Sequence, residues 1–368
     1  MRYQCIYCNK SSFTTLLDYQ FHKAVTSDNK IIEADFILLQ CNNCSLVQKK
    51  IDKKMIDTIE RIYLEYEPYY LSNGEEEKHV VDDKTNTSRS IKVLENAEAI
   101  IKKDGNLLDI GTGSGVFLKE FSKRYNWNLY AQDIKTDKEE QLFRINNFKK
   151  LFIVNEEELY SDYFDMICAI HVFEHIINMN SFLENVKKSL KKDGILLLQL
   201  PNIEENIFDI FTIDHITHFN KYAIYTILKS FFKYVYFPKK QIYREITVIA
   251  SNKKIIKFEE EVLEKKEKGL DQKIQNLISI LTTQEKEVVI FGTSPTALFC
   301  AYMLDFKIQY FIDENRTKVN KTLYNKKIIH PEDLDSNVTI LFPYAKELLQ
   351  KVQIRYPQLN FIYIESEL

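Results

Sequence analysis

The sequence predicts an α/β protein with a seven-stranded, Rossmann-like core, a small cysteine-bearing module before it and a second, smaller Rossmann-like αβ domain after it. Three observations lead to this class. A strand, a glycine turn and a helix follow one another over residues 106–125, further strands alternate with helices up to residue 255, and a second glycine-turn unit begins at Val288. A chain of 368 residues has room for two or three domains. We therefore divide it into residues 1–50, 51–105, 106–255, 256–287 and 288–368.

The composition is that of an ordinary globular protein. Hydrophobic residues make up 45% of the chain, charged residues 28%, and the net charge is −3. Without a basic block, nucleic acid is not expected as a partner. No apolar run reaches transmembrane length, and the N-terminal residues do not have the form of a signal peptide. We therefore expect a cytoplasmic protein, monomeric or homodimeric, that does not bind membranes.

Residues 1–50 contain two CxxC pairs, Cys5 with Cys8 and Cys41 with Cys44. Four thiols in this spacing predict a tetrahedral zinc site, so this module is expected to be a zinc ribbon. A closed shell of four thiolates leaves no open position, which makes the zinc structural. The alternative is a pair of disulfides, which a reducing compartment disfavours. We expect His22, between the pairs, to be a surface residue.

Residues 51–105 are expected to be a mostly helical connector. Residues 66–74 interrupt the helical spacing with Pro68 and Gly74 and form a tyrosine-rich loop. Tyr69 and Tyr70 in this loop are candidate substrate contacts, in a lid or a wall of the site. Plain packing is the alternative, since the chain has 22 tyrosines.

Residues 106–117 read NLLDIGTGSGVF. Three of the eight glycines in the chain, Gly111, Gly113 and Gly115, stand here, where a turn needs positive φ or a ligand approaches the backbone. The spacing is neither that of a dinucleotide site nor that of a phosphate loop. Asp109 beside the turn would repel phosphate and suits a cationic or hydroxyl-bearing ligand. The pattern resembles the first motif of the class I methyltransferases that use S-adenosylmethionine (SAM).

The next segments complete the predicted core. A strand over residues 128–133 ends in Asp133, whose carboxylate can accept hydrogen bonds from both ribose hydroxyls of an adenosine. The strand over 149–154 leads to Asn155, where an adenine would be read. The other elements expected are strands at 164–169 and 194–200, helices at 181–190 and 222–232, and an antiparallel pair at 234–237 and 245–251. The ligand is expected at the carboxyl ends of the strands.

Residues 256–287 are charge-dense and predict one or two connecting helices. The last domain then opens with a strand that ends at Gly292, and further strands are expected at 308–313, 338–342 and 361–364. The glycine code of a dinucleotide site is missing, because Thr293, Ser294 and Pro295 follow the turn. A docking or substrate-positioning role is therefore favoured over dinucleotide binding.

Taken together, the CxxC pairs and the segments LLDIGTGSG, HVFEHI, LPN and DHITHF resemble the zinc-containing SAM methyltransferases of sugar biosynthesis, over nearly the whole chain. The best-known members are C-methyltransferases that act on nucleotide-linked keto-deoxysugars. The resemblance implies SAM and zinc as cofactors, a nucleotide sugar as the small-molecule partner, and His215 as the catalytic base. The chain has Thr212 and Asp214 where those enzymes have tyrosine and glutamate, so O- or N-methylation stays open.

His215 is the expected general base and His175 orients the substrate, because both follow strand ends on the ligand side and imidazole has a reference pKa of about 6.5. The alternative is that both are packing histidines. For His171 and His218 a structural role is the favoured reading. The residues expected to bind the cofactor are Asp109, Gly111, Gly113, Gly115, Asp133, Asn155 and His171. Asn202 is a further candidate substrate contact. A nucleic-acid modifying enzyme and a non-catalytic SAM-binding scaffold are the rival functions.

Overall fold

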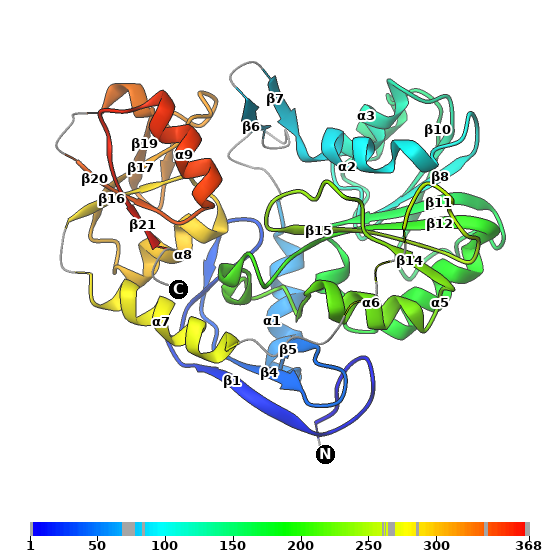
Figure 1. Ribbon diagram of the computed structural model, residues 1–368, viewed down its shortest axis with the longest axis horizontal. Coiled ribbons are helices and arrows are strands. Elements are labelled where there is room, and N and C mark those ends of the chain that lie inside the picture. Colours follow the sequence, from blue (N-terminus) through cyan, green and yellow to red (C-terminus); the bar gives the residue numbers. More distant parts are fainter. Residues whose placement is uncertain are drawn as a thin grey trace.

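The computed structural model describes residues 3–67, 78–82, 85–259, 261, 263, 269–284, 287–334 and 338–364. The ribbon has three parts: a central αβ domain, a C-terminal αβ domain beside it, and an N-terminal module that lies beneath both (Figure 1). Within the described ranges, no helix is both long enough and apolar enough to cross a membrane.

The central sheet has the strand order β10-β9-β8-β11-β12-β15-β14. Its strands are β8 (Asn106–Ile110), β9 (Asn128–Asp133), β10 (Phe148–Ile153), β11 (Phe164–Ile170), β12 (Leu190–Pro201), β14 (Tyr234–Tyr236) and β15 (Glu245–Ser251). The first five are parallel, and β15 is antiparallel to both β12 and β14. This confirms the seven-stranded core and its final antiparallel pair.

Both faces of this sheet are covered, which is why its strands are nearly continuous apolar runs. Successive side chains of β8 point to opposite faces, so Leu107 and Leu108 belong to two different buried clusters. One face is covered by α2 (Arg89–Ala97) and α3 (Val116–Ser122), and the other by α5 (Met179–Ser189) and α6 (Lys221–Lys229) (Figure 1). The short helix α4 (Glu139–Phe143) precedes β10.

The N-terminal module is built on a sheet of order β1-β4-β5-β13. Its own strands are β1 (Phe13–Tyr19), β4 (Phe36–Cys41) and β5 (Val47–Lys49), with a small separate pair β2 (Ala24–Val25) and β3 (Ile31–Ile32). The fourth strand, β13 (Thr217–His218), comes from the central domain and pairs antiparallel with β5. The edge strand of the N-terminal sheet is therefore supplied by the segment that carries His215.

The connector is less helical than expected. Helix α1 (Lys53–Leu64) starts where the side chain of Asp52 accepts a hydrogen bond from the Met55 amide, and a two-stranded pair, β6 (Lys78–Asp82) and β7 (Thr85–Ser88), precedes α2. A single 3₁₀ turn, η2 (Glu98–Ile100), follows α2 and leads to β8. Tyr69 and Tyr70 lie outside the described residues.

The C-terminal sheet has the order β18-β19-β17-β16-β20-β21. Its elements are β16 (Val288–Phe291), β17 (Ile308–Ile312), β18 (Thr322–Leu323), β19 (Lys326–Ile329), β20 (Thr339–Phe342) and β21 (Asn360–Tyr363), with helices α7 (Leu270–Thr282), α8 (Pro295–Met303) and α9 (Lys346–Arg355). All neighbours except β18 are parallel. The order reverses between β16 and β20, as at the ligand-binding switch point of a Rossmann-like sheet, so the expected second domain is confirmed.

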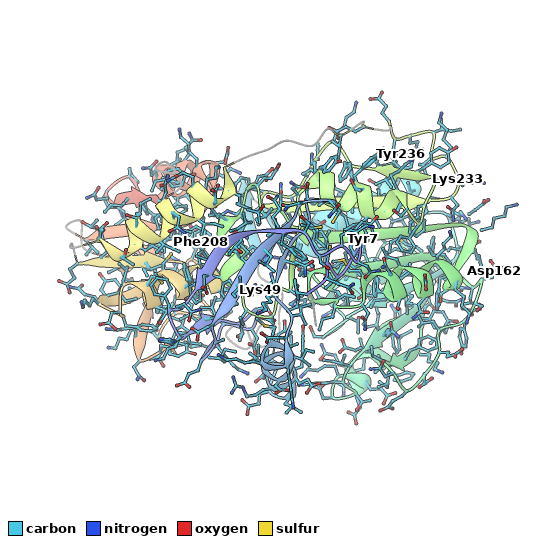
Figure 2. The ribbon with its side chains drawn as sticks, turned by 90° about the horizontal axis from the view of Figure 1, so that it is seen from below. Tyr7, Lys49, Asp162, Phe208, Lys233 and Tyr236 are labelled. Atoms are coloured by element: carbon cyan, nitrogen blue, oxygen red, sulfur yellow. The ribbon has the colours of Figure 1, made fainter. Side chains whose placement is uncertain are left out.

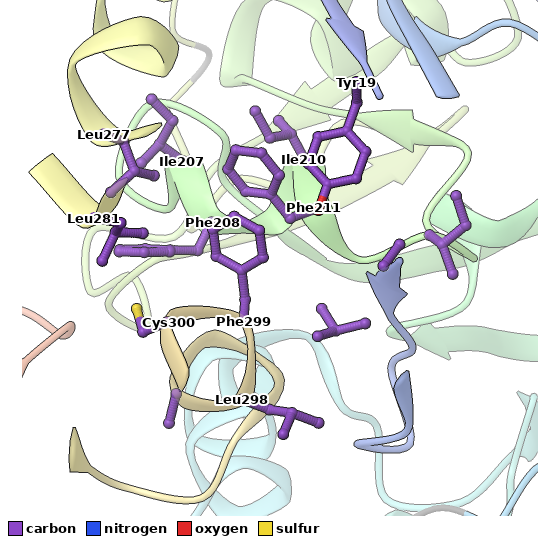
Figure 3. Packing of buried hydrophobic residues seen from close by; sticks show 14 of the residues in the cluster. Tyr19, Ile207, Phe208, Ile210, Phe211, Leu277, Leu281, Leu298, Phe299 and Cys300 are labelled. Atoms are coloured by element: carbon purple, nitrogen blue, oxygen red, sulfur yellow. The ribbon is translucent and has the colours of Figure 1, made fainter. Parts of the chain in front are cut away.

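One hydrophobic core joins the three parts. The 3₁₀ turn η4 (Ile207–Phe211) of the central domain inserts Phe211 against Phe299 of α8, with ring centroids 4.0 Å apart (Figure 3). Tyr19 of β1 packs on Phe211 from the other side at 5.8 Å. Each such aromatic pair adds about 0.5–1.5 kcal/mol to the stability gained from buried area. The shared core fixes the C-terminal domain against the central one and thereby defines the space between them.

Candidate active site

A cleft of about 2530 Å³ lies between the central and C-terminal domains. Its walls come from the segments that follow β8, β9, β10 and β11 on one side and β16, β17 and β20 on the other, so both sheets present their carboxyl ends to it. A drug-sized ligand fills a pocket of roughly 300–1,000 Å³. The cleft therefore has room for two ligands of that size at once.

The glycine turn after β8 lines this cleft. Gly111, Gly113 and Gly115 have φ of 68°, 53° and 72°, in the left-handed region where glycine is favoured. A Cβ on Gly111 would lie 2.3 Å from a methyl carbon of Val172, whereas a Cβ on Gly113 would meet nothing within 4 Å. Gly111 is therefore required by close packing, and Gly113 presents bare backbone to the open space of the cleft.

Asp109 lies buried at the end of β8. Its carboxyl accepts hydrogen bonds from Thr112 Oγ1 at 2.8 Å and from Cys168 Sγ at 3.2 Å. Burial raises the pKa of Asp109 to about 7, and the Thr112 and Cys168 bonds oppose the rise only in part. A cationic ligand beside this carboxyl would favour its ionised form.

Asp133 stands at the end of β9, next to the glycine turn. It accepts hydrogen bonds from the amides of Gly113 and Ile134 at 2.8 and 2.7 Å. Burial raises the pKa of Asp133 although these amides oppose the shift. Asn155, after β10, has φ of 65° and also lines the cleft. The structure thus brings Asp109, Asp133, Asn155 and the glycine turn to one wall.

His171 follows β11 and sits between two carboxylates. Its Nδ1 is 3.0 Å from Glu174 Oε1, and its Nε2 lies 3.3 Å from Glu245 Oε2, within ion-pair range but outside hydrogen-bond geometry. Arg89 donates to the other oxygen of Glu245 at 2.8 Å. Burial and Arg89 lower the pKa of His171, but Glu245 and Glu174 outweigh them and raise it to about 9. His171 lines the same cleft wall as a partly buried imidazolium.

His175 and His215 meet edge to face at the floor of the cleft, with ring centroids 4.7 Å apart. His175 ends the 3₁₀ turn η3 (Phe173–His175), and its Nδ1 is 2.8 Å from the carbonyl oxygen of Asp214. A carbonyl only accepts, so Nδ1 carries the proton and Nε2 holds a lone pair. Burial, and then the nearby His215, lower the pKa of His175, so this imidazole is neutral at neutral pH.

Asp209 holds His215 in place and was not singled out in the sequence. One of its oxygens lies 2.6 Å from Nδ1 of His215 and the other 2.6 Å from Nδ1 of His218. Burial lowers the pKa of His215, but Asp209 outweighs it, so the pKa is raised overall. A carboxylate that orients an imidazole and raises its basicity is the arrangement found in catalytic dyads.

Lys49 is a second residue that sequence reasoning missed. This fully buried side chain donates to the carbonyl oxygens of Thr212 and His215 at 2.8 and 2.6 Å, and its Nζ is 3.2 Å from His218 Nε2. Seen from below, Lys49 lies in the N-terminal strands at the junction of the two larger domains (Figure 2). Burial lowers the pKa of Lys49 to about 7. The N-terminal module therefore supports the backbone of the histidine segment.

The four cysteines of the N-terminal module converge, and their sulfurs all lie within 4.8 Å of one another. Cys5 is 3.6 Å from Cys44, and Cys8 is 3.5 Å from Cys41. A tetrahedral zinc with Zn–S bonds of about 2.3 Å holds its sulfurs about 3.8 Å apart, while a disulfide brings them to about 2.05 Å. The spacing fits a four-cysteine zinc site and does not fit disulfides.

Other expected residues have simpler positions. His22 is exposed, as expected, and its Nδ1 lies 3.2 Å from Asp35. His218 is buried in the Asp209 network. Asn202 is buried behind the cleft, where its side-chain oxygen accepts from the Glu204 amide, and the structure does not bring it to the cleft wall.

One family model matches the part of the chain that carries this site. Residues 84–229 match the model of a family described as "Methyltransferase domain". The similar solved structures include SAM-dependent methyltransferases from Thermotoga maritima (13% identity, TM-score 0.39, 54% of this chain and 100% of that one) and Aquifex aeolicus (18%, 0.37, 55% and 100%). A carbon methyltransferase called CurJ is 18% identical, with a TM-score of 0.36, over 44% of this chain and 55% of that one.

No curated protein sequence matches the chain. The matched segment spans the glycine turn, the histidine of η3 and the elements from β8 to α6. Residues 84–229, which form most of the central domain, are thus similar to a methyltransferase domain.

Proposed function

We propose that the protein transfers the methyl group of SAM to a nucleotide-linked keto-deoxy sugar, with His215 as general base. The observation that carries this proposal is the shared cleft. It joins the glycine turn, with Asp109 and Asp133, to the His175–His215 pair. A methyl donor on the first group of residues and an acceptor on the second would meet within one enclosure.

The cofactor half of the cleft fits SAM. Bound SAM supplies a methyl group already activated on a sulfonium. Asp133 accepts hydrogen bonds from the ribose hydroxyls. The absence of a side chain at Gly113 lets the adenosine approach the backbone of the glycine turn. Asp109, whose pKa burial raises to about 7, becomes favourably ionised next to the cationic part of the ligand. Asn155 reads the adenine, and His171 completes the wall. Gly115, expected among the cofactor contacts, packs against Leu142 instead and does not line the cleft.

The acceptor half is closed by the C-terminal domain. The turn after β16 and the loop after β17 face the cleft with Thr293, Arg316 and Lys318 among their residues. Arg244, from the central domain, adds a further cationic side chain, buried between Phe208 and Tyr344. Cationic groups at the switch point of a Rossmann-like sheet suit the diphosphate of a nucleotide sugar. The C-terminal domain is thus proposed to position the nucleotide.

The histidine pair is proposed to activate the acceptor. With Nδ1 held by Asp209, His215 removes a proton through Nε2 from the carbon next to the ketone, which leaves an enolate. The enolate carbon forms the new bond to the methyl group of SAM. The bond between that methyl carbon and the sulfonium sulfur breaks, and S-adenosylhomocysteine leaves. The proton stays on His215, where Asp209 stabilises the imidazolium. His175 orients the acceptor through Nε2.

A methyl-transfer assay with labelled SAM tests this function on a panel of nucleotide-linked keto sugars, with the corresponding alcohols and amines. The expected product carries a new carbon–methyl bond, and His215→Gln lowers kcat by about 10²–10⁴-fold. His22→Gln, on the exposed surface, is the matched control and keeps full turnover. An O- or N-methyl product would replace the C-methyl assignment. Binding of SAM with no methyl transfer to any acceptor would identify a scaffold instead.

A further inference from the structure

Glu174, His175 and His215 converge at the floor of the cleft from two separate segments. One side-chain donor atom of each residue lies within 4.8 Å of the donor atoms of the other two. His175 and His215 line the cleft, whereas Glu174 is fully buried behind them. The cluster is therefore reached from the cleft through its two histidines.

Each of these side chains has its second polar atom held in place. His175 Nδ1 is bonded to the Asp214 carbonyl, and His215 Nδ1 to Asp209. Glu174 Oε1 is bonded to His171 Nδ1. These bonds leave the two Nε2 atoms and Glu174 Oε2 as the donor atoms available to a ligand. Outer partners of this kind, a carbonyl or carboxylate on the far nitrogen of each imidazole, are what fix metal-binding histidines in the required tautomer and orientation.

Glu174 Oε2 supplies an independent observation. It is buried and has no hydrogen-bond partner among the residues that the structure describes. A buried carboxylate oxygen without a partner destabilises the fold, and more so when the group is charged. A cation at the common centre would satisfy this oxygen and both imidazole lone pairs together.

We propose that Glu174, His175 and His215 form a second metal site, distinct from the four-cysteine site, that takes a divalent transition ion. Two imidazoles and one carboxylate suit Zn²⁺, Mn²⁺, Fe²⁺ or Co²⁺, and three protein ligands leave coordination positions open toward the cleft. The site also has a regulatory consequence that rests on the proposed function. The metal occupies the Nε2 that His215 would use as a base, so the bound ion inhibits methyl transfer.

Mn²⁺ is the ion to use in the test, because four thiolates are a poor site for it and the zinc module stays undisturbed. Full-length protein holding one zinc is titrated with Mn²⁺ by calorimetry and by electron paramagnetic resonance. The expected result is one further equivalent bound. His175→Gln and Glu174→Gln each weaken that binding at least ~10-fold, the lower end of the loss seen for outer-shell changes. His22→Gln is the control that leaves it unchanged.

Two results would overturn the site. One is zinc-replete, folded protein that takes up no Mn²⁺, Co²⁺ or second zinc, in which case a protonated His215 is what compensates Glu174. The other is uptake that neither His175→Gln nor Glu174→Gln weakens. Activity separates this proposal from the proposed function. If Mn²⁺ binds as expected but leaves methyl transfer unchanged, the metal site stands and the assignment of His215 as base fails.

Discussion

Lys49, at the end of β5 in the N-terminal module, donates a 2.6 Å hydrogen bond to the backbone carbonyl of His215. The two residues are 166 positions apart in the sequence. Strand β13 reinforces the link, because it extends the sheet of the N-terminal module only two residues after His215. The cysteine-bearing module therefore forms part of the floor beneath the candidate catalytic histidine.

Replacing Lys49 by methionine tests this link. The substitution removes the Lys49 donor from the carbonyls of Thr212 and His215, of which the first keeps a bond from the His215 amide, so we expect the free energy of unfolding to fall by about 1–3 kcal/mol. Methyl transfer should fall while the affinity for SAM stays the same, since the cofactor wall is elsewhere. Urea unfolding and steady-state kinetics measure both effects. Lys50→Met, at the partly exposed neighbour, is the control. Unchanged kinetics in the Lys49 variant would mean that the module does not support the site.

Removal of zinc should destabilise the same region. Cys8→Ser takes away one of four thiolates, so the purified variant is expected to hold well under one zinc per chain and to unfold at a lower temperature. Cys300→Ala is the comparison, because Cys300 is buried in α8, away from the cluster. That variant loses packing but keeps its zinc. Full zinc content in Cys8→Ser, measured by elemental analysis, would contradict a four-cysteine site.

The affinity for SAM should depend on pH through Asp109. Burial raises the pKa of this carboxyl to about 7, and a cationic ligand favours its ionised form. Binding therefore releases a proton below pH 7, so affinity is expected to fall as the pH falls through 7 and to level off above it. Calorimetric titrations between pH 5.5 and 8.5 measure this dependence. Asp109→Asn should flatten it and weaken binding, whereas the exposed Asp104→Asn should change neither. A pH-independent affinity in the native protein would rule out this role for Asp109.

The rate should depend on pH through His215. A general base must be unprotonated, and Asp209 raises the pKa of His215 above its ordinary value of about 6.5. The rate is therefore expected to rise with pH, with the midpoint of the acid limb above 6.5. Asp209→Asn removes the strongest influence that raises the pKa of His215, so the midpoint moves to lower pH while kcat falls. A pH–kcat profile of both proteins decides this, and an acid limb that stays in place in the variant would assign the base elsewhere.

The two glycine positions should respond differently to alanine. A Cβ on Gly111 would lie 2.3 Å from Val172, so Gly111→Ala should lower both folding stability and SAM affinity. Gly113→Ala has open space around it and should cost only about 1–2 kcal/mol for the left-handed backbone. Its methyl group then lies in the cofactor space, so the loss should be mainly in binding. Chemical unfolding and SAM titration of the pair separate the two effects. Equal loss of stability in both variants would contradict the packing described for Gly111.

The parts of the fold that the sequence predicts well are those encoded locally. The glycine turn, each CxxC pair and each apolar strand can be recognised from about a dozen consecutive residues. Strand β19 and helix α9 were not expected, because their apolar residues are few and partly exposed. The histidines were recognised by their place after strand ends. Their partners were not, because Lys49 reaches His215 only through tertiary pairing, and the spacing of Asp209 from His215 and His218 fits no single helix or strand.

Thermal unfolding of the zinc-replete protein, with and without SAM, tests the central claim most directly. A ligand that binds only the folded state stabilises it by mass action and so raises the unfolding temperature. At a ligand concentration of 100 times Kd, the gain in the free energy of unfolding is about 2.7 kcal/mol. We predict a rise with SAM or S-adenosylhomocysteine, which Asp133→Asn abolishes, and a further rise when one nucleotide-linked keto sugar is added. A folded, zinc-replete protein whose unfolding temperature does not change with SAM would contradict the cofactor site on which the proposed function depends.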